Sequence, residues 1–129
     1  MNDLLQELKN RGCEKIVDLR ESARFELKSI DCGIVFVIAN WSGPAKIGLF
    51  NLADAIATCA VKPKVILVDI DKIDVAWLSA FFHRNKKVSA LHGFGEILLV
   101  KDGKILKQST RLHEQNQSEL HDLLELLSI

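Results

Sequence analysis

The strongest constraint on the fold is a pair of apolar segments separated by a helical pattern. Residues 34–39 and 65–70 are short, rich in β-branched side chains and nearly free of polar ones, which is typical of strands buried on both faces of a sheet. Between them, the apolar residues from Ile47 to Ala60 recur at helical spacing. We expect this helix to begin near Pro44 and to be ended by Pro63. Strands that alternate with helices in this way predict an α/β protein with a mixed sheet.

The remaining segments complete this pattern. We expect helices over residues 3–11, 75–82 and 117–127 and a strand over residues 15–19, whereas residues 21–30 are compatible with either a strand or a short helix. Asp102 and Gly103 separate two apolar runs, and an Asp-Gly pair favours the positive φ values of a tight hairpin turn. The 129 residues contain no linker or low-complexity segment, so the chain is predicted to form one domain over residues 1–129.

Composition argues against several classes of partner. Lys and Arg together number 17, as do Asp and Glu, so no overall positive charge favours nucleic acid or an anionic membrane. The chain has no Tyr, which weakens any proposal of base stacking. No apolar run reaches the ~18–20 residues of a bilayer span, and the N-terminus lacks the pattern of a secretory signal. We therefore expect a cytoplasmic protein that binds neither nucleic acid nor membrane.

The segment Trp41–Ala45 lies where the first buried strand gives way to the helix. In such a context a Cys-x-x-Cys pair would indicate a dithiol redox site. Here Ser42 and Ala45 occupy the two outer positions. A hydroxyl and a methyl group cannot form a disulfide, so the segment has the frame of a redox site without its reacting atoms.

Several pieces of this sequence resemble, in register, the thioredoxin-like superfamily. They are the strand with Trp-x-Gly-Pro-x-Lys over residues 34–46, the strand end Val-Asp-Ile-Asp over residues 68–71, the hairpin over residues 93–103 and the C-terminal amphipathic helix. The resemblance covers residues 34–127. It implies a thioredoxin-like α/β fold, in which helices flank a central mixed sheet of about four to five strands, with an added N-terminal helix here.

The sequence departs from the family pattern at the positions that carry its chemistry. The resemblance implies cysteines at Ser42 and Ala45, a cis-proline at Gly95, and a buried Asp and Lys where Phe36 and Leu67 stand. A cis bond before a residue other than proline costs ~2.5–4 kcal/mol, so we expect a trans peptide before Gly95. Loss of the Asp together with the Lys leaves no orphan charge in the core. Because all of these parts are missing, we expect a natively redox-inactive protein with no catalytic residues, no cofactor and no metal.

We predict instead that the vacated groove binds another protein. Its predicted residues are Trp41, Ser42, Gly43, Pro44, His92, Phe94 and Gly95, and a basic connector carrying Arg84, Lys86 and Lys87 is expected to add charge beside them. Exposed aromatic residues are over-represented at binding hot spots, and Trp41 is exposed in the family that this sequence resembles. Ser42 is predicted to be a helix N-cap rather than a nucleophile, since nothing ties His83 or His92 to it.

Three kinds of function remain open at this point. Among protein-binding modules we favour a bacterial-type immunity protein that neutralises a toxin over an assembly chaperone for an enzyme maturation system. The enzymatic alternative is an atypical single-cysteine oxidoreductase that uses Cys32 or Cys59, although neither lies at a helix N-terminus that would lower a thiol pKa. The structural alternative is a subunit of a homo-oligomer or of a larger assembly.

Overall fold

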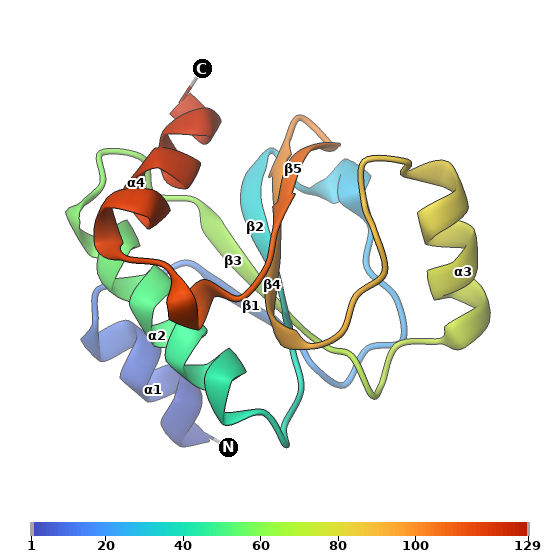
Figure 1. Cartoon of the computed structure of the whole chain (residues 1–129), viewed down its shortest axis with the longest axis horizontal. Coiled ribbons are helices and arrows are strands. Elements are labelled where there is room, and N and C mark those ends of the chain that lie inside the picture. Colours follow the sequence, from blue (N-terminus) through green and yellow to red (C-terminus); the bar gives the residue numbers. More distant parts are fainter. Residues whose placement is uncertain (1, 129) are drawn as a thin grey trace.

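The computed structural model describes residues 2–128, with side chains from Leu4 onward, and arranges five strands in one mixed sheet (Figure 1). The strand order is β1 (Ile16–Leu19), β3 (Lys64–Asp69), β2 (Cys32–Ile38), β4 (Phe94–Lys101) and β5 (Lys104–Ser109). Strands β1 and β2 run parallel to β3, whereas β4 is antiparallel to β2 and β5 is antiparallel to β4. The expected α/β class with a mixed sheet is confirmed.

Helices cover both faces of this sheet. On one face lie α1 (Asn2–Asn10), α2 (Gly43–Thr58) and α4 (Gln117–Glu125), and on the other lies α3 (Val75–Arg84) (Figure 1). Strand β2 therefore contributes side chains to two hydrophobic cores. Phe36 packs with α1, α2 and α4, whereas Val35 and Val37 pack toward α3. Side chains 34–39 are all completely buried, as the apolar run predicts. None of the helices within residues 2–128 combines the length and the apolar character needed to cross a bilayer.

The predicted hairpin and helix start are confirmed. Asp102 and Gly103 adopt positive φ values of 52° and 75° between β4 and β5. Helix α2 begins at Gly43, and the Ser42 side chain caps it by accepting a hydrogen bond from the backbone N of Ala45 at 3.1 Å. The peptide bond before Gly95 is trans, as is every other peptide bond in the described chain.

Other predicted boundaries are wrong. Helix α2 ends at Thr58, well before Pro63, because Cys59 already has an extended backbone with φ −90° and ψ 150°. Helix α3 continues to Arg84, and Asn85 ends it by donating from its side chain to the carbonyl of Phe81 at 2.8 Å. Residues 21–30 form a loop with one 3₁₀ turn (Leu27–Ser29) rather than a strand or an α-helix.

Candidate functional site

The candidate site lies at the edge of the sheet where β2 and β3 end and β4 begins. Parallel strands β2 and β3 both have their carboxyl ends there, so the Trp41 loop and Asp71 emerge side by side. Phe94 opens β4 at the same edge, paired with Ile38. The topology thus brings together residues that are far apart in sequence, and we call this edge of the sheet the Trp41 edge.

Three rings follow one another along the Trp41 edge. Trp41 is 61% exposed and contacts Phe94 edge-on, with 5.6 Å between the ring centroids. Phe94 is 41% exposed and stacks with the ring of His92 at 6.4 Å. The indole of Trp41 is held from one side, because its Nε1 donates to Oδ2 of Asp71 at 3.1 Å. We call Trp41, Phe94 and His92 the aromatic row.

A buried carboxylate holds the two loops on which Trp41 and Asp71 lie. Asp69, 1% exposed at the end of β3, accepts from the Asn40 side chain at 3.1 Å and from the backbone N of Asp71 at 2.8 Å. Since Asp71 in turn binds the Trp41 indole, Asp69 fixes the position of the ring without touching it. Asp69 is not among the residues predicted for the site, although an acid within an otherwise apolar strand is a visible signal of such a role.

A second buried carboxylate holds the start of β4. Glu96 is 1% exposed and accepts hydrogen bonds from the backbone N–H groups of His92 and Gly93, the latter at 2.6 Å. It therefore fixes the turn that presents His92 and Phe94. Glu96 is likewise not among the predicted binding residues, although it too is an acid that precedes an apolar run.

Gly95 is an extra residue in the β2–β4 pairing. Ile38 pairs with Phe94 and Val37 pairs with Glu96, so Gly95 forms a β-bulge between them. Its φ is +86°, a conformation that side chains other than hydrogen rarely adopt. A Cβ atom at Gly95 would lie 3.5 Å from Cα of Ala45, so the bulge brings β4 against the start of α2.

The two positions at which a dithiol would lie are both buried. Ser42 is 2% exposed, and its hydroxyl oxygen is occupied as the helix cap. Ala45 is completely buried. Beneath them, Phe36 and Leu67 are register partners on β2 and β3 and are both completely buried, so this part of the core contains an aromatic ring and an aliphatic side chain. Within the described residues, no hydrogen bond joins Ser42 to a histidine, and the arrangement offers no activated nucleophile.

The basic connector does not lie beside the Trp41 edge, and that expectation is wrong. Helix α3 runs away from this edge, so Arg84 lies near Gly103 in the β4–β5 hairpin at the opposite end of the sheet (Figure 1). The chain with Lys86 and Lys87 then returns past β5, where the backbone N of Ser89 donates to the Gln108 side chain at 2.8 Å. Of the binding residues predicted after α3, only His92, Phe94 and Gly95 reach the Trp41 edge.

The cysteines lie elsewhere, and burial raises the thiol pKa of two of them. Cys32 begins β2 at the hairpin end of the sheet, away from Trp41. Cys59 follows the C-terminus of α2, where burial raises its thiol pKa and the charge of Glu125 adds to the rise, opposed by Lys62. Burial raises the pKa of Cys13 to about 11. These shifts favour the neutral thiol at both positions.

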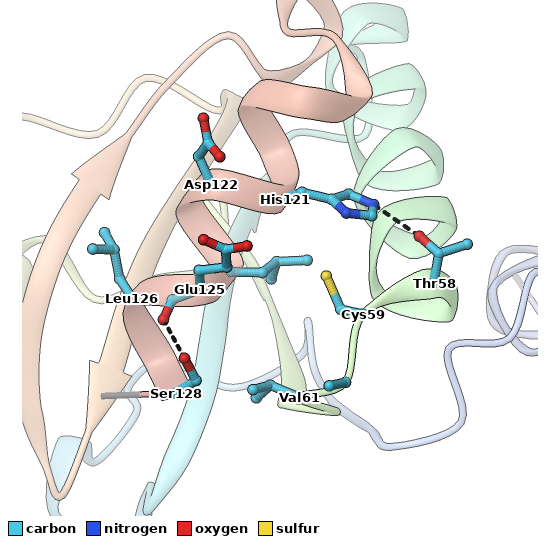
Figure 2. A pocket seen from close by; sticks show the side chains of 10 residues that line it. Thr58, Cys59, Val61, His121, Asp122, Glu125, Leu126 and Ser128 are labelled. Carbon is cyan, nitrogen blue, oxygen red and sulfur yellow. Dashed lines mark hydrogen bonds between the residues drawn. The ribbon is translucent and has the colours of Figure 1, made fainter.

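Cys59 borders a hollow between α2 and α4 that also contains His121 and Thr58 (Figure 2). Thr58 Oγ1 donates to the carbonyl of Ala55 at 3.2 Å and lies 2.8 Å from Nε2 of His121. Across residues 4–128, no three His, Cys, Asp or Glu side chains are grouped so as to hold a metal ion.

The raised thiol pKa values predict slow alkylation of the folded chain. At pH 8 a thiol with a pKa of about 11 is ~0.1% thiolate. We expect iodoacetamide to modify Cys13 roughly 100-fold more slowly in the native chain than in urea, with the native rate rising steadily with pH toward 11. Peptide mass spectrometry of quenched time points measures this ratio. Equal rates in the two conditions would contradict the assigned burial.

Solved structures with a similar backbone span nearly the whole chain. A mutant thioredoxin from Halobacterium salinarum is 19% identical, with a TM-score of 0.58, and the match covers 89% of this chain and 92% of that one. Oxidized mitochondrial thioredoxin 3 from Saccharomyces cerevisiae is 20% identical, with a TM-score of 0.60, over 94% of this chain and 99% of that one. A chain from a structure concerning thiol resolution in yeast mitochondrial 1-Cys peroxiredoxin gives 20% identity and a TM-score of 0.60 over 87% and 95%. No known protein-family profile and no curated protein sequence matches this chain. These likenesses establish the thioredoxin-like fold.

Proposed function

We propose that this chain, whose fold is that of a thioredoxin, is a redox-inactive module that binds another protein through the aromatic row at the Trp41 edge. One observation carries the proposal. Exposed rings stand where two loops and a strand meet, and two buried carboxylates hold them in place, while the positions for a dithiol are filled by a helix cap and a buried methyl group. A thiolate is the species that thiol exchange requires, and this edge has none.

The distribution of exposed apolar side chains supports the same surface. Trp41 and Phe94 belong to the aromatic row. Ile47 lies in the second turn of α2 and Val75 is the first residue of α3, and both helices start from this edge. Their exposed fractions are 54% for Ile47 and 81% for Val75. Large apolar side chains that gather at one end of a protein are typical of interaction sites. Aromatic anchors at such sites contribute a disproportionate share of binding energy.

Within this class we propose a bacterial-type cytoplasmic immunity protein that neutralises a toxin, with an assembly chaperone as the alternative. The rigidity of the aromatic row favours the first. A surface fixed before binding loses little conformational entropy and suits one tightly bound partner, whereas binding of many clients favours an adaptable surface.

Substitution of Trp41 by Ala tests the surface. We expect the affinity for a co-purified partner to fall by about 30-fold or more, as for an aromatic hot spot worth about 2 kcal/mol. Leu106→Ala is the matched control, since Leu106 is also an exposed apolar side chain, at 39%, but lies on β5. Affinity capture from the native host with wild type and both variants, followed by titration of the recovered partner, measures the effect. Equal recovery of every partner with Trp41→Ala would remove the aromatic row from the proposal.

Insulin reduction tests the absence of redox chemistry separately. We expect no turnover above background, because no cysteine lies at the Trp41 edge and the pKa values of Cys13 and Cys59 are raised. Turnover that disappears in a Cys32→Ser or Cys59→Ser variant would instead support the single-cysteine oxidoreductase.

A further inference from the structure

A hollow of about 570 Å³ lies along α3, between this helix and the loop before β2. Its walls come from the segment that contains the 3₁₀ turn at Leu27–Ser29, from α3 between Trp77 and Arg84, and from Gly103 of the β4–β5 hairpin, which Figure 1 shows at one end of the molecule. We call it the α3 hollow. The motif that the sequence singled out as a basic connector begins here, with Arg84 on its rim.

The floor of the α3 hollow is aromatic. Trp77 stacks on Phe81 with 5.1 Å between centroids, and both rings contact Phe25, at 4.9 Å and 5.0 Å. Phe25 and Phe81 are almost fully buried, whereas Trp77 is half-buried. The three rings support one another, so the hollow has a rigid apolar base that is accessible chiefly through Trp77.

The rim is positively charged although the chain as a whole has no net charge. Arg24, Lys28 and Arg84 border the hollow with a single acid, Glu26, and Lys86 and Lys87 follow Arg84 after one intervening residue, Asn85. Among the described residues, Lys28, Arg84, Lys86 and Lys87 form no ion pair, so their charges are not neutralised within the chain.

The positive side chains on the rim make few contacts that stabilise the fold. Asn85 caps the carbonyl of Phe81 at 2.8 Å, so Arg84 is not required to end α3. Arg24 is held only by an exposed contact with Asp74 at 3.3 Å, which an incoming anion can replace at small cost.

We propose that the α3 hollow is a second binding site, one that takes an acidic peptide segment of a partner protein with an aromatic side chain among its carboxylates. The aromatic side chain packs against Trp77, and the flanking carboxylates pair with Lys28 and Arg84, Arg84 having the planar geometry that favours carboxylates. The site lies beside α3 and shares no residue with the aromatic row, so it does not rest on the proposed function of that row.

The same features disfavour a nucleic acid. Binding of a single strand relies on successive exposed rings and a basic track along the backbone. Here the hollow offers a single half-buried Trp ring, Trp77, instead of a row of exposed rings.

Trp77 supplies a direct readout of binding. The chain has two Trp residues, so Trp41→Phe leaves Trp77 as the only tryptophan and removes the indole from the aromatic row. In this background we expect a short peptide of Glu residues around one Phe to change Trp77 fluorescence saturably. We expect a Lys28→Glu/Arg84→Glu double variant to bind about tenfold more weakly or worse, and the affinity to fall with added salt.

Matched variants distinguish binding in the α3 hollow from a nonspecific effect of net charge. Lys9→Glu/Lys46→Glu makes the same change in net charge at exposed helix positions away from the hollow and should bind the peptide as well as the parent. A peptide with Ser in place of Phe should bind several-fold more weakly. The proposal is overturned if the peptide causes no saturable change in Trp77 fluorescence, or if both double variants weaken peptide binding equally. It is also overturned if the Ser peptide binds as tightly as the Phe peptide, or if single-stranded RNA binds more tightly than the Phe peptide. Circular dichroism of each variant confirms that it is folded before titration.

Discussion

Replacing Phe36 by Asp is expected to destabilise the chain by more than about 5 kcal/mol, which is enough to unfold many small domains. Phe36 is completely buried and lies between its strand partners Leu67 on β3 and Ile97 on β4. Removal of a buried Phe side chain alone costs ~3–5 kcal/mol. The new carboxyl group adds the cost of burying a polar group with no partner. The substitution introduces the residue that the thioredoxin-like resemblance implies at this position. The result therefore shows whether the core of this chain tolerates a buried acid.

The pH dependence of Phe36→Asp gives a second test. Burial raises the pKa of the introduced carboxyl above its value of about 3.9 in the unfolded chain. The folded state therefore binds more protons, and the free energy of unfolding falls as pH rises above that value. Urea denaturation at pH 5 and pH 8, followed by circular dichroism, measures both effects. Val75→Asp is the matched control, because Val75 is 81% exposed and should tolerate the change within about 0.5 kcal/mol. A stable Phe36→Asp variant at pH 8 would contradict the apolar environment described for this position.

Glu96→Ala is expected to lower the free energy of unfolding by about 3 kcal/mol and to release one side of the aromatic row. The Glu96 carboxylate accepts from the backbone N–H groups of His92 and Gly93, and hydrogen bonds to a charged group contribute ~1.5–3 kcal/mol each. Without it, both N–H groups are left unsatisfied and the turn that carries His92 and Phe94 loses its anchor. Glu96→Gln should cost less, since an amide oxygen still accepts but carries no charge.

The global and local effects of Glu96→Ala can be measured apart. Urea denaturation gives the loss of stability, and Trp41 fluorescence in a Trp77→Phe background reports on contact with Phe94 before the chain unfolds. Glu14→Ala removes an exposed acid that makes no hydrogen bond or ion pair within the described residues and serves as the control. If Glu96→Ala loses less than about 0.5 kcal/mol, the carboxylate does not anchor this turn.

Much of the sheet could be predicted because its central strands are buried on both faces. A run such as residues 34–39 leaves no polar side chain to suggest a solvent-facing side, and every one of these side chains is indeed completely buried. The hairpin was equally visible, since Asp102 and Gly103 favour the positive φ values that they adopt. Local chemistry decides both features, so local sequence is sufficient to find them.

Asp69 and Glu96 stand out in the sequence as acids beside apolar residues, but the groups that they hold could not be assigned from local sequence. Asp69 and Glu96 act on backbone N–H groups and on an amide side chain from loops whose positions depend on the whole sheet. The placement of Arg84 failed for a related reason. Sequence places the basic segment between α3 and β4, but only the direction of α3 across the sheet decides at which end it lies.

The cap formed by Ser42 limits how this chain could acquire sulfur chemistry through successive single substitutions. A cysteine at position 42 would give up the hydroxyl that accepts from Ala45, at a cost of about 1 kcal/mol for a lost helix cap. A cysteine at position 45 would add a sulfur where Ala45 is completely buried against the Gly95 bulge. Either single replacement carries its penalty before a second sulfur is present to form a bond. Stability alone therefore opposes each mutational path toward a disulfide at its first step.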